Sequence, residues 1–520
     1  MHRTSLTLTV VIALTAAAAA ADGPGQFRVP EGFRVSQFAG DDLVHDVCSM
    51  TFDPRGRVVV SGPGYVKTLH DDDGDGRADR VTQFAAGPGS GARGLTFDGN
   101  DLLCTGDHAL ARYRDRDGDG VADGEREVLA KLHVGSDHSA NGIVRGPDGW
   151  LYIACGNDAL VTKDHIHSAI SPVADPQQGV VYRVSADGTR ADVLAHGFRN
   201  PYDLDFAADG TLWLVDSDGE RDQYLPWYSP TRLFEVAAGR HHGWVLPGWQ
   251  RSWNRPPWFF DAVPRAVELG RGSPAGGVVY RHRRFPDRYR GCYFSLCWSL
   301  GRVYALTPQF HGDRATATSE VFLESVGSDG FAPVDIGVGP DGQMYVAIGG
   351  RGTKGGVYRI DAVGDPADAT AGKPAADATP LVRVLTADQP LASWSRAAWL
   401  PVARELGADA FTRAAVDAAL PEAARVRAIE VLTELFGGVP PSAAATLVAD
   451  ESRMVRSRLA WSLGRSFEQD PDARGATLAR LTHDADERVR RHAWEALLEL
   501  PAPAVAQQKL NWSDILEPRP

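Results

Sequence analysis

The sequence predicts an all-β six-bladed β-propeller followed by an α-helical HEAT-like solenoid, and three observations carry this prediction. A strand–turn–strand pattern recurs between residues 50 and 360, and a companion strand of the form GVVYR or GVYR accompanies several copies. Beyond residue 381, segments with helical periodicity recur at steps of about 30 residues. The 55 Gly and 33 Pro among 520 residues also favour a chain that is rich in turns.

Each copy of the strand pattern consists of an apolar strand, an Asp/Gly turn and a second apolar strand. The turn glycines are Gly56, Gly99, Gly149, Gly210 and Gly342. A sixth copy is expected within residues 277–306, because the gap before the last turn glycine is about twice the others. Six copies of about four strands each predict a closed propeller over residues 27–361, in which no sheet edge is left exposed.

The composition becomes rich in Ala, Asp and Pro after Ile360, which predicts a linker at residues 362–380. HEAT-like helical repeats are expected over residues 381–503, and a C-terminal tail over residues 504–520. An arginine heads one helix of each expected repeat: Arg396, Arg427, Arg456 and Arg490. We expect these arginines to contact acidic residues of the neighbouring repeat, and the solenoid to offer a surface for a protein partner.

The first 21 residues have the form of a secretory signal peptide. They comprise a short basic start, an apolar run and a group of small residues at the end. The alternative, an uncleaved anchor, would need a longer apolar run, and no later segment is long and apolar enough to span a membrane. We therefore expect an exported protein, located in the periplasm or outside the cell.

The charge and the cysteine pattern argue against two functional classes. With 54 Lys+Arg against 67 Asp+Glu, the net charge is −13, which argues against a nucleic-acid partner. No Cys-x-x-Cys-His sequence is present to attach a c-type haem. The five cysteines leave at least one thiol unpaired, and a bond between Cys292 and Cys297 is possible but not required.

Two acidic loops fit the pattern D-x-D-x-D-G-x-x-D. Their acidic residues are Asp71, Asp73, Asp75 and Asp79 in the first loop, and Asp115, Asp117, Asp119 and Asp123 in the second. Alternate carboxylates on a tight loop converge on one point, and Ca²⁺ binds six to eight such oxygens. The pattern predicts two structural Ca²⁺ sites, and the alternative is a pair of solvated acidic turns.

Chemically active side chains gather in three stretches at expected strand ends. Asp137 and His138 precede one inner strand, Arg199 and Asn200 precede the next, and several acids and histidines lie within residues 216–242. An Asp-His pair suits a general base, while Arg and Asn suit the binding of a carboxylate. Five tryptophans form a further cluster: Trp227, Trp244, Trp249, Trp253 and Trp258. They predict either a platform for a sugar ring or a loop packed by its own aromatic residues.

The segments DHSANGIVRGPDGWLYIACG, GFRNPYDLDFAADGTLWLVD and GRHHGW occur in this order. Together they resemble the soluble glucose/sorbosone dehydrogenase family, six-bladed propellers that use pyrroloquinoline quinone (PQQ) and calcium. The resemblance covers about residues 27–361. The wider layout, with a leader, DxDGDG loops and HEAT-like repeats, is similar to secreted bacterial proteins of the membrane-bound dehydrogenase type.

The resemblance implies roles for individual residues. His138 would be the catalytic base that takes a proton from a sugar or polyol hydroxyl, and Asp137 would orient it. Arg199 and Asn200 would contact the quinone. The active-site Ca²⁺ would be held in part by backbone carbonyls near Asp218 and Gly219.

The sequence also departs from the family pattern. The quinone-binding lysine of the family would lie near Ser299, where Arg302 is the closest cation, and a later arginine pair would fall at Ala332 and Val334. Further cations that could replace these contacts are Arg93, Arg351 and Lys354.

Two functions follow from these observations. The first is an exported PQQ-type, calcium-assisted dehydrogenase that oxidises a sugar or related alcohol and passes electrons to a separate acceptor. The alternative is a non-catalytic propeller that binds a glycan or a protein, with the helical repeats as a second interaction surface. The Asp-His and Arg-Asn pairs favour the first function, and the missing cations favour the second.

Overall fold

The computed structural model describes residues 26–135, 137–225, 228–244, 262–364 and 378–510. The predicted signal peptide lies outside these ranges, as do most of the predicted linker and the last ten residues of the predicted tail. Four of the five clustered tryptophans also lie outside them: Trp227, Trp249, Trp253 and Trp258.

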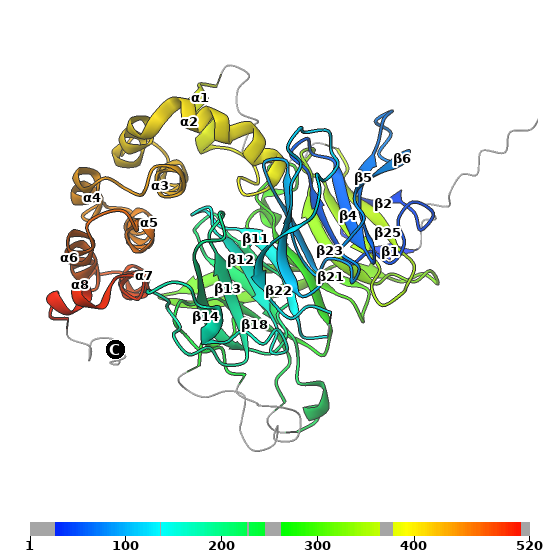
Figure 1. Ribbon diagram of the computed structural model, residues 1–520, viewed down its shortest axis with the longest axis horizontal. Helices are drawn as coiled ribbons and strands as arrows, with labels where there is room; N and C mark the ends of the chain where they lie inside the picture. The colour runs from blue at the N-terminus through cyan, green and yellow to red at the C-terminus, as the bar shows by residue number, and fades with distance from the viewer. Residues whose placement is uncertain (1–25, 136, 226–227, 245–261, 365–377, 511–520) are drawn as a thin grey trace, which may run out of the picture.

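The described strands form six antiparallel sheets, which confirms the predicted six-bladed propeller (Figure 1). The inner strands are β3 (Ser49–Phe52), β7 (Gly94–Asp98), β11 (Ala140–Arg145), β15 (Leu204–Phe206), β19 (Pro274–Val279) and β23 (Pro333–Val338). The second strands are β4 (Val58–Gly62), β8 (Asp101–Gly106), β12 (Leu151–Cys155), β16 (Leu212–Asp216), β20 (Tyr293–Cys297) and β24 (Met344–Ile348).

Two further strands complete each blade. The third strands are β5 (Tyr65–His70), β9 (Ala109–Tyr113), β13 (Gly179–Val184), β17 (Thr231–Glu235), β21 (Arg302–His311) and β25 (Gly356–Ala362). The outer strands are β6 (Arg80–Ala85), β10 (Glu127–Lys131), β14 (Ala191–Phe198), β18 (Val267–Gly270), β22 (Arg314–Ser325) and β2 (Phe33–Ala39). A short strand, β1 (Phe27–Arg28), pairs with the edge of β22.

The blades close into a ring because each inner strand contacts the next in the order β3, β7, β11, β15, β19, β23 and back to β3. The last blade combines β23–β25 with the N-terminal β2, whose Phe33 lies opposite Ala362. Strands such as β12 are buried along their whole length, since each blade is covered by its neighbours on both faces. The Asp/Gly turns use a left-handed residue, for example Gly149 with φ of 80°.

The ring has two faces, which differ in what covers them. We call the face where the six inner strands begin the front face, and the face where they end the back face. Helices cover the back face (Figure 1). They are α1 (Pro380–Leu385), α2 (Ser393–Val416), α3 (Glu422–Leu435), α4 (Pro441–Leu447), α5 (Arg453–Arg465), α6 (Pro471–Leu481), α7 (Glu487–Leu497) and α8 (Ala502–Gln507).

Helices α3, α5 and α7 lie nearer to the propeller than α4, α6 and α8 (Figure 1). Two of the expected contacts between neighbouring repeats are present, since Arg396 pairs with Glu434 at 2.5 Å and Arg456 with Asp484 at 2.7 Å. Arg427 pairs instead with Glu430 of its own helix. The assignment of these helices to HEAT-like repeats stays a prediction.

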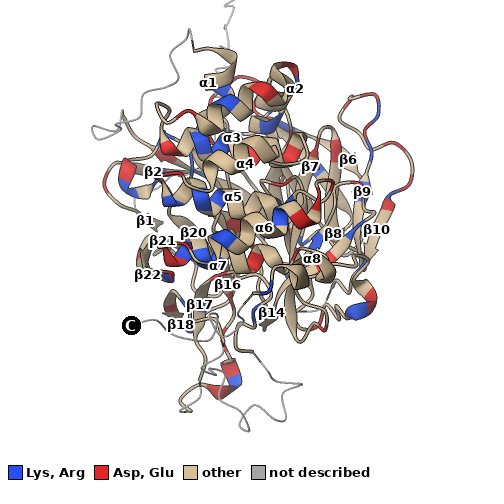
Figure 2. Ribbon diagram, turned by 90° about the vertical axis from the view of Figure 1, so that its left-hand side faces the viewer, with Lys and Arg blue, Asp and Glu red and all other residues tan. Residues whose placement is uncertain are grey.

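Arginines of the inner helices bind acidic residues of the propeller. Arg465 contacts Asp148 at 2.7 Å, Arg488 contacts Asp209 at 3.2 Å, and Arg491 contacts Glu235 at 2.5 Å. Figure 2 shows how charges of both signs are distributed over these helices. One face of the helical segment is therefore used within the chain, and only its other surfaces can meet the partner expected from the sequence.

The loop between α1 and α2, together with the first turn of α2, closes the back end of the central axis. Gln389 Nε2 donates to the carbonyl of Val279 at 3.2 Å, and Trp394 Nε1 donates to the carbonyl of Val338 at 3.0 Å. Both carbonyls belong to the last residues of inner strands. The axis is consequently covered at the back by this chain's own helical segment.

All five cysteines are buried and carry free thiols, so the open question of a Cys292–Cys297 bond is answered in the negative. Among the described residues, none of the helices combines the length and the apolar character that crossing a bilayer requires.

Candidate functional site

The front face brings together His138, Arg199, Asn200 and Arg93, because each of them lies just before an inner strand. His138 is buried, with 8% of its surface exposed. Its Nδ1 lies 2.7 Å from Oδ1 of Asn157, the second residue after β12. The amide of Asn157 is oriented by its Nδ2, which donates to Asp158 Oδ1 at 3.4 Å.

This contact sets the tautomer of His138. An amide oxygen only accepts hydrogen bonds, so the proton lies on Nδ1 and the lone pair on Nε2. Burial lowers the pKa of His138, and the positive charge of Arg199 lowers it further. His138 is therefore an uncharged imidazole at neutral pH, with a basic Nε2.

The expectation that Asp137 orients His138 is corrected by the structure. The carboxylate of Asp137 is exposed and pairs with Arg351 at 2.8 Å. The side chain that holds His138 is Asn157, which is not among the site residues predicted from the sequence. A signal for it exists in the hairpin register: β11 and β12 pair Ala140 with Cys155, and two further steps outward place His138 opposite Asn157.

Arg199 lies near His138, but its guanidinium is held within the protein. Only 1% of the residue is exposed. Its Nη1 donates to Ser217 Oγ and its Nη2 to Glu220, both at 2.8 Å. The buried carboxylate of Asp216 accepts from the backbone nitrogen of Arg199 at 3.0 Å, which fixes this part of the chain. Arg199 therefore acts on the site through its charge.

Asn200 is also engaged at both ends of its amide. Nδ2 donates to the backbone oxygen of Asp137 at 2.9 Å, and Oδ1 accepts from Asn141 at 3.1 Å. Its backbone nitrogen donates to Asp216 at 2.8 Å. Asn200 thus ties the loop before β11 to the loop before β15.

Arg302 does not reach this group of residues. It begins β21, two strands out from the axis, and its guanidinium is bound to Glu324 of β22 at 2.8 and 2.5 Å. The predicted cofactor-binding role of Arg302 is therefore not supported by its position. Lys354 lies near Asp41 and lowers the pKa of that carboxyl, after the larger effects of Gly355 and His45.

Arg93 is a cation at the front end of an inner strand. It directly precedes β7 and lies beside Tyr202, which raises the pKa of Arg93. Cys48 and Asp46 raise it further. The Nε atom of Arg93 is buried and has no hydrogen-bond partner among the described residues. A buried donor of this kind is costly unless a ligand or water satisfies it.

Asp218 and Gly219, where the resemblance places a Ca²⁺ ion, lie in the loop after β16. Asp218 is fully buried, and its Oδ2 accepts from the hydroxyl of Tyr228 at 2.7 Å. Its Oδ1 has no partner among the described residues, and burial raises the pKa of Asp218. The carbonyl of Gly219 accepts from the backbone nitrogen of Asp222 at 2.8 Å. The unsatisfied carboxylate oxygen suits a cation.

The two acidic loops lie far from the axis, at the outer hairpins β5–β6 and β9–β10. Each brings three of its four predicted carboxylates within 4.8 Å of one another: Asp71, Asp73 and Asp79, and Asp115, Asp117 and Asp123. Asp75 and Asp119 are not part of these groups, and each accepts a hydrogen bond from the backbone nitrogen two residues on, at 2.8 Å. The same arrangement occurs in both loops.

Solved structures with a similar fold include the PQQ domain of a pyranose dehydrogenase from Coprinopsis cinerea, with 13% identity and a TM-score of 0.47. That match covers 65% of this chain and 98% of the other. Aldose sugar dehydrogenases from Escherichia coli and Streptomyces coelicolor match with 14% and 15% identity and TM-scores of 0.45 and 0.44. Each covers 64% of this chain and 99% of the other.

No curated protein matches this sequence. A family model described as a domain of unknown function, DUF7133, matches residues 21–347, which is more than half of the chain. The chain therefore belongs to the DUF7133 family.

Proposed function

We propose that this protein is an exported dehydrogenase of the quinoprotein type, which oxidises a sugar or related alcohol with His138 as the general base. The observation that carries the proposal is the buried His138, whose Nδ1 is bound by Asn157, so that the basic lone pair lies on Nε2.

The residues of this chain would have distinct roles in the reaction. Nε2 of His138 accepts the hydroxyl proton of the substrate as the carbon–hydrogen bond breaks. Asn157 holds the imidazole in the required tautomer. Burial and, after it, the charge of Arg199 lower the pKa of the imidazole, so that it is neutral and can accept this proton. PQQ, when bound, would supply the oxidant that takes up the hydride.

The residues fit an anionic cofactor only in part. Arg199 and Arg302 are engaged with Glu220 and Glu324, so neither is positioned to bind a carboxylate of PQQ. On the front face, two arginines would bind the carboxylates of PQQ: Arg93, whose Nε is unsatisfied, and the exposed Arg351. The unsatisfied Oδ1 of Asp218 would bind the active-site Ca²⁺, together with the backbone at Gly219.

The two acidic loops would each bind a structural Ca²⁺ ion. Since the sequence offers no site for a c-type haem, electrons would leave to a separate acceptor. The helical segment would bind a protein partner through surfaces that the propeller leaves uncovered.

The test uses the purified protein without the predicted leader. PQQ and Ca²⁺ are titrated by calorimetry, and reduction of a dye by aldoses and polyols is then measured. We expect PQQ- and Ca²⁺-dependent turnover that falls by about 100-fold or more in His138→Ala. The exposed His167 offers a matched control, and His167→Ala should retain full turnover. Absence of PQQ binding, or equal turnover in His138→Ala, would refute the proposal and favour a non-catalytic binding propeller.

A further inference from the structure

One ion pair crosses the mouth of the central axis on the front face. Arg351 lies in the loop between β24 and β25, and Asp137 lies in the loop that leads into β11. The inner strands of these two blades are three steps apart in the ring of six, so the blades are opposite each other. The guanidinium of Arg351 nevertheless lies 2.8 Å from the carboxylate of Asp137.

The backbone holds Arg351 in a conformation that favours glycine. Its φ is 59°, and the neighbouring Gly350 and Gly352 have φ of 83° and 75°. A non-glycine residue adopts this region at a cost in free energy, and such strain is concentrated at functional positions. The loop rests on Trp298, whose Nε1 donates to the carbonyl of Gly349 at 2.9 Å and whose ring lies 5.6 Å from the Arg351 guanidinium.

The stability that this ion pair adds does not account for the left-handed backbone at Arg351. The side chains of Arg351 and Asp137 are 65% and 72% exposed, and an ion pair in that setting adds little to stability. A ligand carboxylate can therefore replace Asp137 at small cost. Closer to the inner strands, the buried Nε of Arg93 has no partner among the described residues, which supplies a second cation with an unsatisfied donor.

We propose that Arg351 and Arg93 form a carboxylate-binding clamp over the front face, and that Asp137 occupies Arg351 until a ligand displaces it. This inference rests on the proposed function and names the ligand class of the same site: an organic anion with at least two carboxylates. One carboxylate replaces that of Asp137 on Arg351, and the other accepts from Arg93. PQQ belongs to this class, and the two arginines take over contacts for which Ser299, Ala332 and Val334 have no charge.

The test measures binding directly by calorimetry at low ionic strength. The probes are PQQ and benzene-1,2,4-tricarboxylate, which carries three carboxylates and no quinone. We expect Arg351→Gln to weaken the binding of both probes by about tenfold, because it removes a charge-assisted contact. Asp137→Asn should strengthen binding by about threefold, because it removes the competing carboxylate. A misfolded variant would not bind more tightly, so the opposite signs separate recognition from a structural effect.

Two further variants provide a matched control and separate an effect on binding from an effect on stability. Arg34 is exposed to a similar extent, 70%, and is paired with Asp361. Arg34→Gln should leave binding unchanged and serves as the matched control. Arg351→Gly should weaken binding without lowering the thermal midpoint, because glycine accepts the left-handed backbone. Failure of the wild-type protein to bind either probe overturns the proposal, as does binding that is indifferent to Arg351 and Asp137.

The outcome is distinguishable from that of the proposed function. Tricarboxylate binding that depends on Arg351, in a protein with no dye reduction, would support the clamp and refute the dehydrogenase. PQQ-dependent turnover with binding that is unaffected by Arg351→Gln and Asp137→Asn would support the dehydrogenase and refute the clamp.

Discussion

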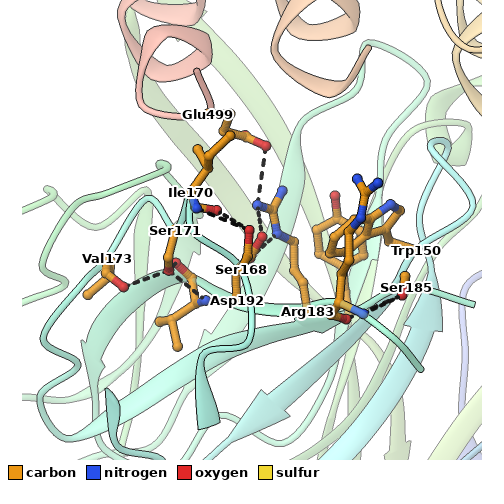
Figure 3. Close-up of polar contacts among 12 residues, drawn as sticks. Trp150, Ser168, Ile170, Ser171, Val173, Arg183, Ser185, Asp192 and Glu499 are labelled. Atoms are coloured by element: carbon orange, nitrogen blue, oxygen red, sulfur yellow. Dashed lines mark hydrogen bonds and ion pairs between the residues drawn. The ribbon is translucent and has the colours of Figure 1, made fainter. Parts of the chain in front are cut away.

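Glu499 provides the sharpest test of how the helical segment is attached to the propeller. It follows α7, and its side chain is 3% exposed. Its two oxygens accept from Arg183 of β13 at 3.2 Å and from Arg465 of α5 at 2.5 Å (Figure 3 shows the contact with Arg183). Although burial acts in the opposite direction, the two arginines lower the pKa of Glu499.

The change Glu499→Ala leaves two buried guanidinium groups with fewer partners. Arg183 keeps both oxygens of Asp192 at 2.7 and 2.8 Å, and Arg465 keeps Asp148 at 2.7 Å. Because removal of one member of a buried ion pair costs 3–5 kcal/mol in general, we expect a loss of about 4 kcal/mol. With a denaturant slope of about 2 kcal/mol/M, the first urea transition should fall by about 2 M.

The measurement follows urea unfolding by circular dichroism at 222 nm, which reports the helices, and by tryptophan fluorescence. Glu405 lies exposed on α2, and Glu405→Ala is the matched control, with an expected change within about 0.5 kcal/mol. Equal midpoints for the two variants would refute the view that Glu499 ties the helices to the propeller.

Three further predictions concern the site, the acidic loops and the inner strands. Asn157→Asp places a negative charge beside His138, so the pKa of His138 should rise and the acid limb of the kcat/KM profile should move to higher pH; an unmoved limb would contradict the assigned contact. Chelation of Ca²⁺ should lower the thermal midpoint of the wild-type protein and have a smaller effect on Asp71→Asn, whereas equal shifts in calorimetry would favour solvated turns. Burial raises the pKa of Asp205 from 3.8 to about 6, so the folded chain binds the additional proton between these values and its stability falls as the pH rises through this window. The stability difference between wild type and Asp205→Asn in urea titrations should therefore shrink by about 3 kcal/mol from pH 4 to pH 7, and parallel curves would refute the shift.

The propeller could be predicted because each blade repeats a local signal. Residues such as Gly149 mark turns that need a left-handed residue, and the strands between them are apolar along their whole length. These signals lie within short stretches of chain, so each can be recognised without knowledge of the other blades. The position of His138 before an inner strand follows from the same pattern.

The contacts that define the site depend on geometry that short stretches do not contain. Asn157 becomes visible only when the register of the β11–β12 hairpin is continued past its last pair. The pair of Arg351 and Asp137 joins residues 214 positions apart and depends on closure of the ring. The docking of the helices on the propeller cannot be predicted from the sequence either, because arginines of one helix bind different parts of the chain. In α5, Arg456 binds Asp484 of the helical segment and Arg465 binds Asp148 of the propeller.

The pairing of β2 with β25 has a consequence for the order in which the chain folds. As the ribosome releases the polypeptide, the earlier blades can form from neighbouring segments, but β2 has no partner until β25 emerges more than 300 residues later. A chain that stops before Gly356 leaves β2 and β24 with open edges, which are templates for aggregation. The last blade thus couples a stable fold to complete synthesis, and prematurely ended products should be cleared as insoluble or degraded material.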